Sequence, residues 1–349
     1  LSSLGIHSPE AAFQSLQVIA ATGIPLDLID SLFGQLERWL PETSAADDAL
    51  KNLERFIVGS RSPISLAALI QRDLQTLPIL LEIFSSSQRL SDLLIQDPEG
   101  FDLIRLTEGQ PISKSDLLKE LKTELDSNNS FRTVVTSLRR FKNRELLRIA
   151  YGDWIRELPL ETTVKQLTGL AEVISQVGLD YCLTTAEKKF GWPTRSNGKP
   201  VCFSLLAFGE LAGECLGFEE PLEITGIFDH DGNTTGPRRI AAQEFFGRAL
   251  ADLLALLSDD NPEGIAYRLK FNREASAGGH TSCSQIAFTS HYDHHGQAWD
   301  RLQLIRCRPI AGDLNLGQRT LDSLQAWIFP RYITAVDLAE FHSLRPRLQ

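Results

Sequence analysis

The chain has 349 residues, a formal net charge of −10 and five cysteines. This length suits two domains, or one domain with a large helical extension. The acidic balance argues against a nucleic-acid binder or a binder of anionic membranes, because either needs a basic face. The cysteines are scattered and form no Cys-x-x-Cys pair, so reduced thiols are expected rather than a zinc or redox motif.

The sequence predicts a cytoplasmic protein without membrane contact. No apolar run approaches the ~20 residues that a membrane helix needs, and the first residues lack the charged and then apolar pattern of a signal peptide. Residues 335–349 keep a helical pattern to the last residue without a C-capping glycine. We therefore expect the sequence to be part of a longer chain.

Residues 1–195 are predicted to form a helical region, because apolar residues recur at three- and four-residue spacing. Ser8 and Pro9 are typical of a helix start, as the N-cap and the first helical residue. A basic run in this region could face phosphate, but runs of charge usually form a solvated helix face, which is the preferred interpretation. The run consists of Arg139, Arg140, Lys142 and Arg144.

The pattern changes near residues 191–200, where Pro193, Gly198 and Pro200 end the helical periodicity. The sequence then predicts strands at 201–208, 222–228 and 264–272 and helices at 238–258 and 284–307. This alternation indicates a small mixed α/β domain over 196–312, and residues 313–349 are expected to form C-terminal helices that lead out of it.

The strand at 222–228 follows a Gly-x-x-x-Gly segment, Gly209 to Gly213, and carries a carboxylate, Glu223, near its start. A glycine-bearing segment, a strand and a carboxylate together suggest a site that handles phosphate. Pro221 stands where a second carboxylate on the same face would be most useful, because alternate residues of a strand face the same way.

These residues carry a resemblance to a known family. The segments "FGELAGECLGFEEPLEITGIFDHDG", "QEFFGR" and "AWDRLQLIRCRPIAGD" resemble the polymerase-β-like nucleotidyltransferase domain of glutamine synthetase adenylyltransferase, also called the adenylyl-removing enzyme. The segments "NLERFIVGS" and "RELLRIAYGDWI" resemble the helices that precede the first of that family's two catalytic halves. The resemblance implies an α+β fold, with a helical N-terminal region, the nucleotidyltransferase domain and C-terminal helices.

In that family the first half removes AMP from glutamine synthetase by phosphorolysis and the second half adds AMP from ATP, so the resemblance implies Mg²⁺ and ATP or ADP as cofactors. Three carboxylates hold the metal ions, two on alternate residues of one strand and a third on its neighbour. By resemblance, the two strand positions fall on Pro221 and Glu223, and the third falls on Lys270. Three negative charges thus become a proline, a carboxylate and an ammonium, whose charges cancel.

Other phosphate-facing positions also differ. The family's lysine after the first glycine corresponds to Glu210, and its two downstream arginines correspond to Asn272 and Glu274. The framework matches are retained at Gly209, Gly213, 243–246, Trp299, Arg301, Arg306, Arg308 and Pro309. A retained scaffold with a changed site predicts a pseudoenzyme that needs no cofactor, in which Glu223 and Lys270 lie close enough to pair directly or through one water.

The preferred function is therefore a regulatory or structural one in the control of glutamine synthetase and nitrogen assimilation. The resemblance implies glutamine synthetase, the PII signal protein or a second transferase half as partners. One alternative is an active nucleotidyltransferase that adds or removes AMP on glutamine synthetase. Another is a metal-independent nucleotide sensor, whose contacts would be Gly209, Gly213 and Arg268.

Three further clusters have a functional and a plainer interpretation. Asp229 and Asp231 form an Asp-x-Asp pair, but they follow the strand in a run of turn formers, which favours a solvent-facing turn. His291, His294 and His295 have helical spacing that can chelate zinc, but an exposed polar face is preferred. Glu219 and Glu220 could extend a site with Glu223, although alternation places Glu220 on the opposite face from Glu223.

Overall fold

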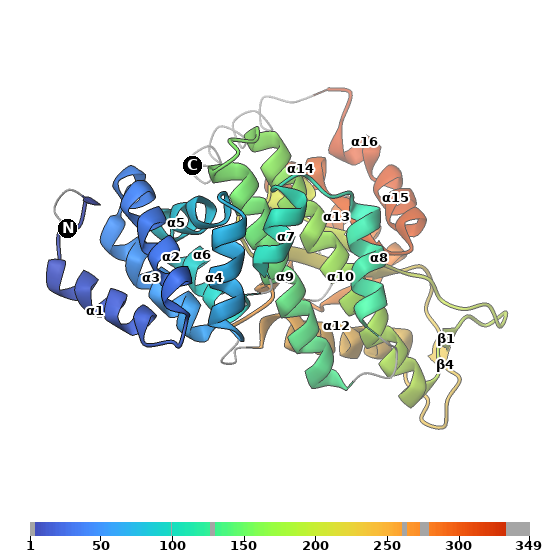
Figure 1. Ribbon diagram of the computed structural model, residues 1–349. Coiled ribbons are helices and arrows are strands. Elements are labelled where there is room, and N and C mark those ends of the chain that lie inside the picture. The colour runs from blue at the N-terminus through green and yellow to red at the C-terminus, as the bar shows by residue number, and fades with distance from the viewer. Residues whose placement is uncertain (1–3, 99, 126–129, 260–263, 273–278, 333–349) are drawn as a thin grey trace. The chain divides into compact units, whose positions relative to one another are not determined.

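The structure of the protein is a computed structural model, which describes residues 4–98, 100–125, 130–259, 264–272 and 279–332. The chain forms two compact units. Unit 1 comprises residues 1–111 and 143–159, and unit 2 comprises residues 112–142 and 160–349. The described residues are mostly helical with a small mixed sheet, which confirms the expected α+β class (Figure 1).

Unit 1 is helical, as predicted. Its core is built from the apolar faces of the helices, with Leu53, Phe56, Leu80 and Phe84 among the fully buried side chains. Its elements are α1 (Pro9–Ala20), α2 (Leu26–Trp39), the 3-10 helix η2 (Leu40–Glu42), α3 (Ala46–Gly59), α4 (Pro63–Arg72), α5 (Thr76–Ser86), α6 (Gln88–Gln96), α7 (Gly100–Thr107) and the second half of α9 (Phe131–Trp154).

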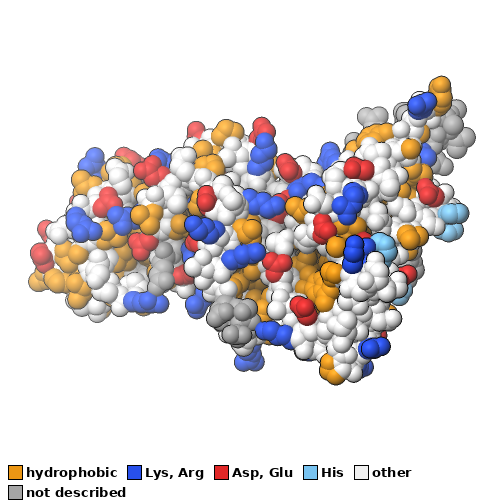
Figure 2. All heavy atoms as spheres, turned by 90° about the vertical axis from the view of Figure 1, so that its right-hand side faces the viewer, with side chains coloured by type: hydrophobic (Ala, Val, Ile, Leu, Met, Phe, Trp, Pro, Cys, Tyr) orange, Lys and Arg blue, Asp and Glu red, His pale blue; other side chains and the backbone are white. Residues whose placement is uncertain are grey.

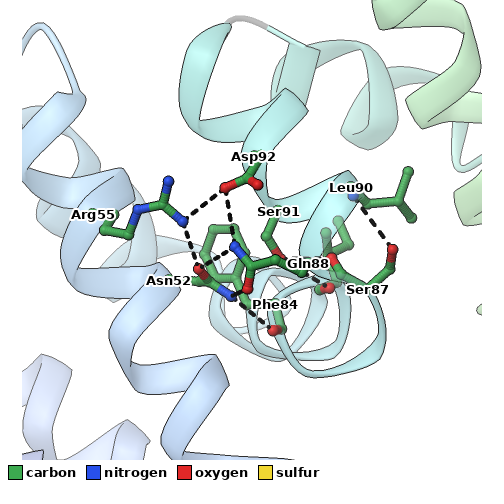
Figure 3. Close-up of polar contacts among 9 residues, drawn as sticks. Asn52, Arg55, Phe84, Ser87, Gln88, Leu90, Ser91 and Asp92 are labelled. Atoms are coloured by element: carbon green, nitrogen blue, oxygen red, sulfur yellow. Dashed lines mark hydrogen bonds and ion pairs between the residues drawn. The ribbon is translucent and has the colours of Figure 1, made fainter.

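One buried polar residue, Asn52, connects helices α3, α5 and α6. Its amide donates to the carbonyl oxygen of Phe84 at 3.2 Å and to the side chain of Gln88 at 3.2 Å (Figure 3). Arg55 donates to the Asn52 oxygen at 3.0 Å and pairs with Asp92 at 2.7 Å. A buried amide must find such partners, because leaving one unpaired costs about 1–3 kcal/mol.

Unit 2 contains a five-stranded sheet and helices that precede and follow the strands of this sheet in the sequence. Its strands in the main sheet are β2 (Phe203–Ala207), β3 (Leu222–Phe228), β5 (Leu269–Phe271), β6 (Ser282–Ser284) and β7 (Arg308–Gly312). The strand order is β5-β3-β2-β7, with β6 pairing β3 beyond β5. Strands β5 and β6 run parallel to β3, whereas β2 is antiparallel to both β3 and β7.

The remaining elements of unit 2 are α8 (Lys114–Glu124), the first half of α9, α10 (Leu160–Phe190), β1 (Pro193–Thr194), α11 (Gly209–Ala212), β4 (Asn233–Thr234), α12 (Ala242–Ser258), α13 (Gln285–His295), α14 (Ala298–Arg306), α15 (Leu314–Ser323) and α16 (Gln325–Ile328). Strands β1 and β4 pair in a separate two-stranded ribbon (Figure 1).

Each face of the main sheet has its own core. On one face, Phe203 and Phe228 stack on Phe246 of α12, with ring centroids 4.5 and 5.5 Å apart. On the other face, Leu206 and Ile227 belong to a buried cluster with residues of α13, α14, α15 and α16. Because side chains alternate along β3, Glu223 and Thr225 lie on the same face as Ile227.

Two predictions for unit 2 are wrong in detail. The helix expected over 284–307 is two helices, α13 and α14, separated at Gly296 and Gln297. The sequence predicts no strand over 308–312, but these residues form β7, and Pro309 lies next to an irregularity in its pairing with β2. Residues 195 and 196 both belong to unit 2, in which α10 packs against α12 and β7. The division into 1–195, 196–312 and 313–349 stays a prediction.

The preferred interpretation of the basic run on α9 is also wrong. Arg139 and Lys142 are buried rather than solvated. Arg139 donates to the carbonyl oxygen of Asp259 at the end of α12, and the Lys142 ammonium lies 4.3 Å from the ring centroid of Tyr267. Of the four residues in the run, only Arg140 is exposed. The long side chains of Arg139 and Lys142 pack within unit 2.

Among the described helices, none is by itself both long and apolar enough to cross a membrane. Helices α4 and α5 pass that test only as a pair, by length and composition, and they are bent by 112° at the break between them.

Candidate functional site around Glu223 and Lys270

The parallel pairing of β3 with β5 places Glu223 directly beside Lys270 in the sheet register. The Lys270 ammonium nitrogen lies 3.7 Å from Oε1 of Glu223, within ion-pair distance. The side chain of Glu223 is 20% exposed and that of Lys270 is 67% exposed. The predicted proximity of the two residues is therefore confirmed.

The glycine segment lies against the same carboxylate. The backbone N–H of Phe208 donates to the carbonyl oxygen of Glu223 at 2.9 Å. Gly209 follows with φ of 59°, and a Cβ atom there would lie 3.5 Å from Oε2 of Glu223. Glu210 and Pro221 are exposed nearby in sequence. A positive φ favours glycine at position 209, and this turn starts the short helix α11 beside the carboxylate.

By strand alternation, Arg268, Lys270 and Asn272 share one face of β5, and of these Arg268 and Lys270 are exposed whereas Asn272 is buried. Asn272 is buried, and its amide donates to the side chain of Gln303 on α14 at 3.0 Å. Its carbonyl oxygen accepts from the Thr225 hydroxyl at 2.9 Å. Asn272 therefore anchors the end of β5 to α14, which covers the same face of the sheet. Glu274 lies outside the described residues.

Helix α11 is held by a charge cluster around the buried Glu172 that sequence reasoning missed. Arg308 donates to the carbonyl oxygens of Leu211 and Ala212, both at 2.9 Å. It also pairs with Glu172 of α10, which in turn pairs with Lys114 of α8. Glu172 is 4% exposed. This cluster fixes the end of the glycine segment, because carbonyls at a helix C-terminus need donors.

Two of the retained framework residues lie close to one another. A Cβ atom at Gly213 would come within 3.3 Å of the Arg306 side chain. Arg301 lies over the Trp327 ring, 5.1 Å from its centroid, while Trp299 is half-buried. Phe245 and Phe246 of the 243–246 run are fully buried. These residues contribute to packing within unit 2. Their match to the family is therefore explained by the fold alone.

The residues of the site do not fit a catalytic metal pair. Glu223 supplies one carboxylate, Pro221 has no ligand atom in its side chain, and the Lys270 ammonium repels a divalent cation. In the part of the chain that the structure describes, no three His, Cys, Asp or Glu side chains are grouped so that they could hold a metal ion. Metal sites for phosphoryl chemistry use carboxylates to hold the metal ions, which in turn coordinate the phosphate oxygens, and this site has a neutral ion pair there.

The Asp-x-Asp pair of Asp229 and Asp231 lies at the opposite end of β3 from Glu223. Asp229 is buried, accepts from the Cys202 N–H at 3.1 Å and pairs with Arg195. Asp231 is exposed. The expectation of a solvent-facing turn is therefore wrong for Asp229 and right for Asp231. Because the Asp229 carboxylate is already occupied, the pair is not available to a metal.

The histidine cluster on α13 lies on a polar face, as expected. His294 and His295 are exposed and His291 is half-buried. The rings of His291 and His295 have centroids 5.8 Å apart. On the face that Figure 2 shows, basic side chains are interspersed with acidic ones. The described side chains on this face thus form no broad basic patch, and the expectation that the protein does not bind nucleic acid stays a prediction.

Comparison with known proteins identifies a family whose model matches this chain. A family model described as glutamate-ammonia ligase adenylyltransferase matches residues 77–323. The bifunctional glutamine synthetase adenylyltransferase/adenylyl-removing enzyme of Shewanella frigidimarina is 26% identical over 274 residues, which cover 77% of this chain and 28% of the relative. The enzyme of the same name from Mesorhizobium japonicum is 26% identical over 321 residues, which cover 90% of this chain and 31% of the relative. The chain thus spans less than a third of these relatives.

Proposed function

Because the chain belongs to the glutamate-ammonia ligase adenylyltransferase family, we propose that it acts in the control of glutamine synthetase without transferring nucleotidyl groups itself. Its domain of 196–312 would have the polymerase-β-like nucleotidyltransferase fold of the family, and it would act through protein contacts in the cytoplasm. Glutamine synthetase is the proposed partner, because the names of the related proteins include it.

The observation that carries this proposal is the Glu223 and Lys270 ion pair at 3.7 Å. By resemblance, metal-binding carboxylates would stand at Pro221, Glu223 and Lys270. In this chain the ammonium lies beside the remaining carboxylate and neutralises it. Nucleotidyl transfer depends on metal ions that neutralise phosphate charge and align the reacting oxygens. A neutral pair at this place supports a domain that keeps its fold for recognition.

The position of Glu210 also supports a domain that does not transfer nucleotidyl groups. It follows Gly209 at the start of α11 and is exposed, so it adds a negative charge where an incoming phosphate would approach. A short helix start would otherwise attract an anion through its free N–H groups. A carboxylate at that place repels phosphate, which weakens the case for phosphorolysis.

An assay of AMP release from adenylylated glutamine synthetase, with phosphate and Mg²⁺, tests the proposal. We expect no release above a blank without the protein, and no transfer of AMP from ATP. A complex between the chain and glutamine synthetase should still form in size-exclusion chromatography. Release that depends on Mg²⁺, disappears in Glu223→Ala and persists in the exposed control Glu220→Ala would overturn the proposal and support an active enzyme.

Calorimetric titration with ATP, ADP and AMP, each with and without Mg²⁺, tests nucleotide sensing. Arg268 is exposed next to β5, and Gly209 lies beside Glu223, so these residues are the proposed contacts of a sensor. Binding without Mg²⁺ that is lost in Arg268→Ala would support a sensor rather than a purely structural domain. Absence of binding, together with complex formation, would support the structural role.

A further inference from the structure

A cavity of about 560 Å³ lies within unit 1, where the start of α5, the end of α7 and the end of α9 meet. Its charged and polar lining includes Asp73, Glu82, Arg105, Glu108, Tyr151 and Arg156. Aliphatic side chains such as Ile79 and Ile104 complete its wall. Apolar walls with a few convergent polar groups are the usual composition of a small-molecule site.

A second cavity of about 420 Å³ adjoins the first and shares Pro78, Glu82 and Ile155 with it. Two tryptophans, Trp39 and Trp154, line this second cavity. Glu82 therefore lines both cavities. Tyr151 lines the first cavity, and the indole rings of Trp39 and Trp154 line the second. Aromatic faces beside a carboxylate attract cations.

The charges that line the first cavity are paired except for one. Arg105 pairs with Asp73 at 2.9 Å, and Arg156 pairs with Glu108. The Glu82 side chain is exposed at the edge of the cavity and makes no ion pair or side-chain hydrogen bond within the described part of the chain, and partial desolvation raises its pKa. Three carboxylates and two guanidinium groups leave a single negative charge, which lies at Glu82.

The Tyr151 hydroxyl is a second polar group without a partner. Tyr151 is 4% exposed, and among the described residues its hydroxyl makes no hydrogen bond. Burial raises its pKa, and the charges of Arg156, Glu82 and Glu108 also act on it. These three residues line the same cavity, so the hydroxyl faces that cavity. The hydroxyl can therefore donate to, or accept from, a ligand in the cavity.

The backbone at the rim of the cavity is tightly packed. Gly109 has φ of 72°, and a Cβ atom there would lie 2.8 Å from the backbone nitrogen of Gly152. Glu108 also adopts a left-handed conformation, with φ of 49°. Residues other than glycine are held in this region only when surrounding contacts enforce it. This turn brings Glu108 to Arg156, while Arg105 is paired separately with Asp73.

We propose that Glu82 and Tyr151 bind the ammonium group of a small aliphatic amine, whose carbon chain lies between the aliphatic wall and the indole rings of Trp39 and Trp154. The ammonium donates to the Glu82 carboxylate and to the Tyr151 oxygen, which both accept. A simple amine fits better than an amino acid, because both arginines that could bind a second carboxylate are already paired. The site lies in unit 1 and is independent of the function proposed for Glu223.

Titration of the full chain with n-butylamine, followed by tryptophan fluorescence and calorimetry, tests this site. Butan-1-ol and butyrate have the same carbon chain without the positive charge and serve as matched probes. We expect a dissociation constant on the order of 1 mM or tighter for the amine and no saturable binding of the other two. Saturable binding of butyrate, or none of the amine, would overturn the proposal.

Three variants locate the site. Glu82→Gln should weaken amine binding about tenfold or more, and Tyr151→Phe should weaken it several-fold, because each removes one acceptor. Glu37→Gln removes a carboxylate from an exposed position of α2 outside the cavity and should bind like the parent. Equal affinity of Glu82→Gln and the parent would place the amine elsewhere and overturn the assignment.

The dependence on pH gives an independent readout. Glu82 binds the ammonium only when it is ionised, and its pKa is raised above the ordinary 4.5. Affinity should therefore be full near neutral pH and fall as the pH is lowered through that raised pKa. In Glu82→Gln this dependence should disappear. The same fall in the variant would assign the effect to another group and count against Glu82 as the acceptor.

Discussion

Lys270 and Glu223 are direct neighbours on parallel strands, with the ammonium nitrogen 3.7 Å from the nearer carboxylate oxygen. An ion pair with one partner this exposed contributes at most about 1 kcal/mol to folding, because water screens it. Its main effect is therefore electrostatic. It cancels the one carboxylate that, by resemblance, remains of a metal site.

Restoring three carboxylates should reverse this balance. The variant Pro221→Asp, Glu223→Asp, Lys270→Asp brings three negative charges together, and two like charges about 6 Å apart repel by roughly 3 kcal/mol at an effective dielectric near 20, less where water reaches them. Without metal, the variant should melt below the parent. Added Mg²⁺ should recover this loss, because it binds the folded state only.

The parent is the control for that measurement. Millimolar Mg²⁺ should leave its melting temperature almost unchanged, since the neutral pair gives the ion little to bind. A parent that Mg²⁺ strongly stabilises would contradict the proposed loss of the metal site. Differential scanning fluorimetry of both proteins over a Mg²⁺ series distinguishes the outcomes.

Much of unit 2 could be predicted from local patterns. Strand β3 has the predicted bounds, because apolar and polar residues alternate over 222–228 and polar turns flank them. The proximity of Glu223 and Lys270 could also be predicted, but only through the resemblance, because the pairing of β3 with β5 joins segments more than forty residues apart. Periodicity alone contains no information on which strands pair.

The errors come from tertiary partners that local sequence does not reveal. Asp229 is buried because Arg195, far along the chain, pairs with it. Strand β7 was missed although a signal was present, since the residue before a proline avoids helical geometry and Arg308 precedes Pro309. The break before α14 also had a signal, a capping box between Gln297 and Asp300.

The buried cluster around Glu172 should be important for stability. Glu172→Gln leaves the Arg308 and Lys114 cations without their shared carboxylate and should lower the free energy of unfolding by about 2–4 kcal/mol. Glu161→Gln on the same helix removes a fully exposed carboxylate that pairs with Lys165, and should change the free energy of unfolding far less, because water screens that pair. Urea denaturation of both variants gives the comparison. Equal losses would show that the buried cluster adds nothing beyond a surface pair.

Cysteine labelling tests the packing of the sheet and its helices. Cys215 is exposed, whereas Cys182, Cys283 and Cys307 are buried. Burial raises the pKa of the Cys182 and Cys307 thiols, and each unit of increase lowers the reactive thiolate about tenfold at a given pH. Iodoacetamide at neutral pH should therefore modify Cys215 first, as peptide mass mapping would show. Cys182 or Cys307 reacting as fast as Cys215 in the folded protein would contradict this packing.

The Asp-x-Asp pair after β3 offers a test with its own control two residues away. Asp229→Ala removes the partner of Arg195 and the acceptor of the Cys202 N–H, so both donors lose a buried carboxylate. The free energy of unfolding should fall by about 3 kcal/mol, as for other broken buried pairs. Asp231→Ala removes an exposed carboxylate and should change it by about 0.5 kcal/mol or less.

A metal site at this pair would give the opposite pattern. Both aspartates would then ligate the ion, so either substitution would abolish stabilisation by Mg²⁺ or Ca²⁺ while costing little in the absence of metal. Thermal melting of the parent, Asp229→Ala and Asp231→Ala, with and without each ion, compares the two patterns. Because Asp229 already pairs with Arg195 and accepts from the backbone, we expect a large loss in Asp229→Ala alone and no response to either ion.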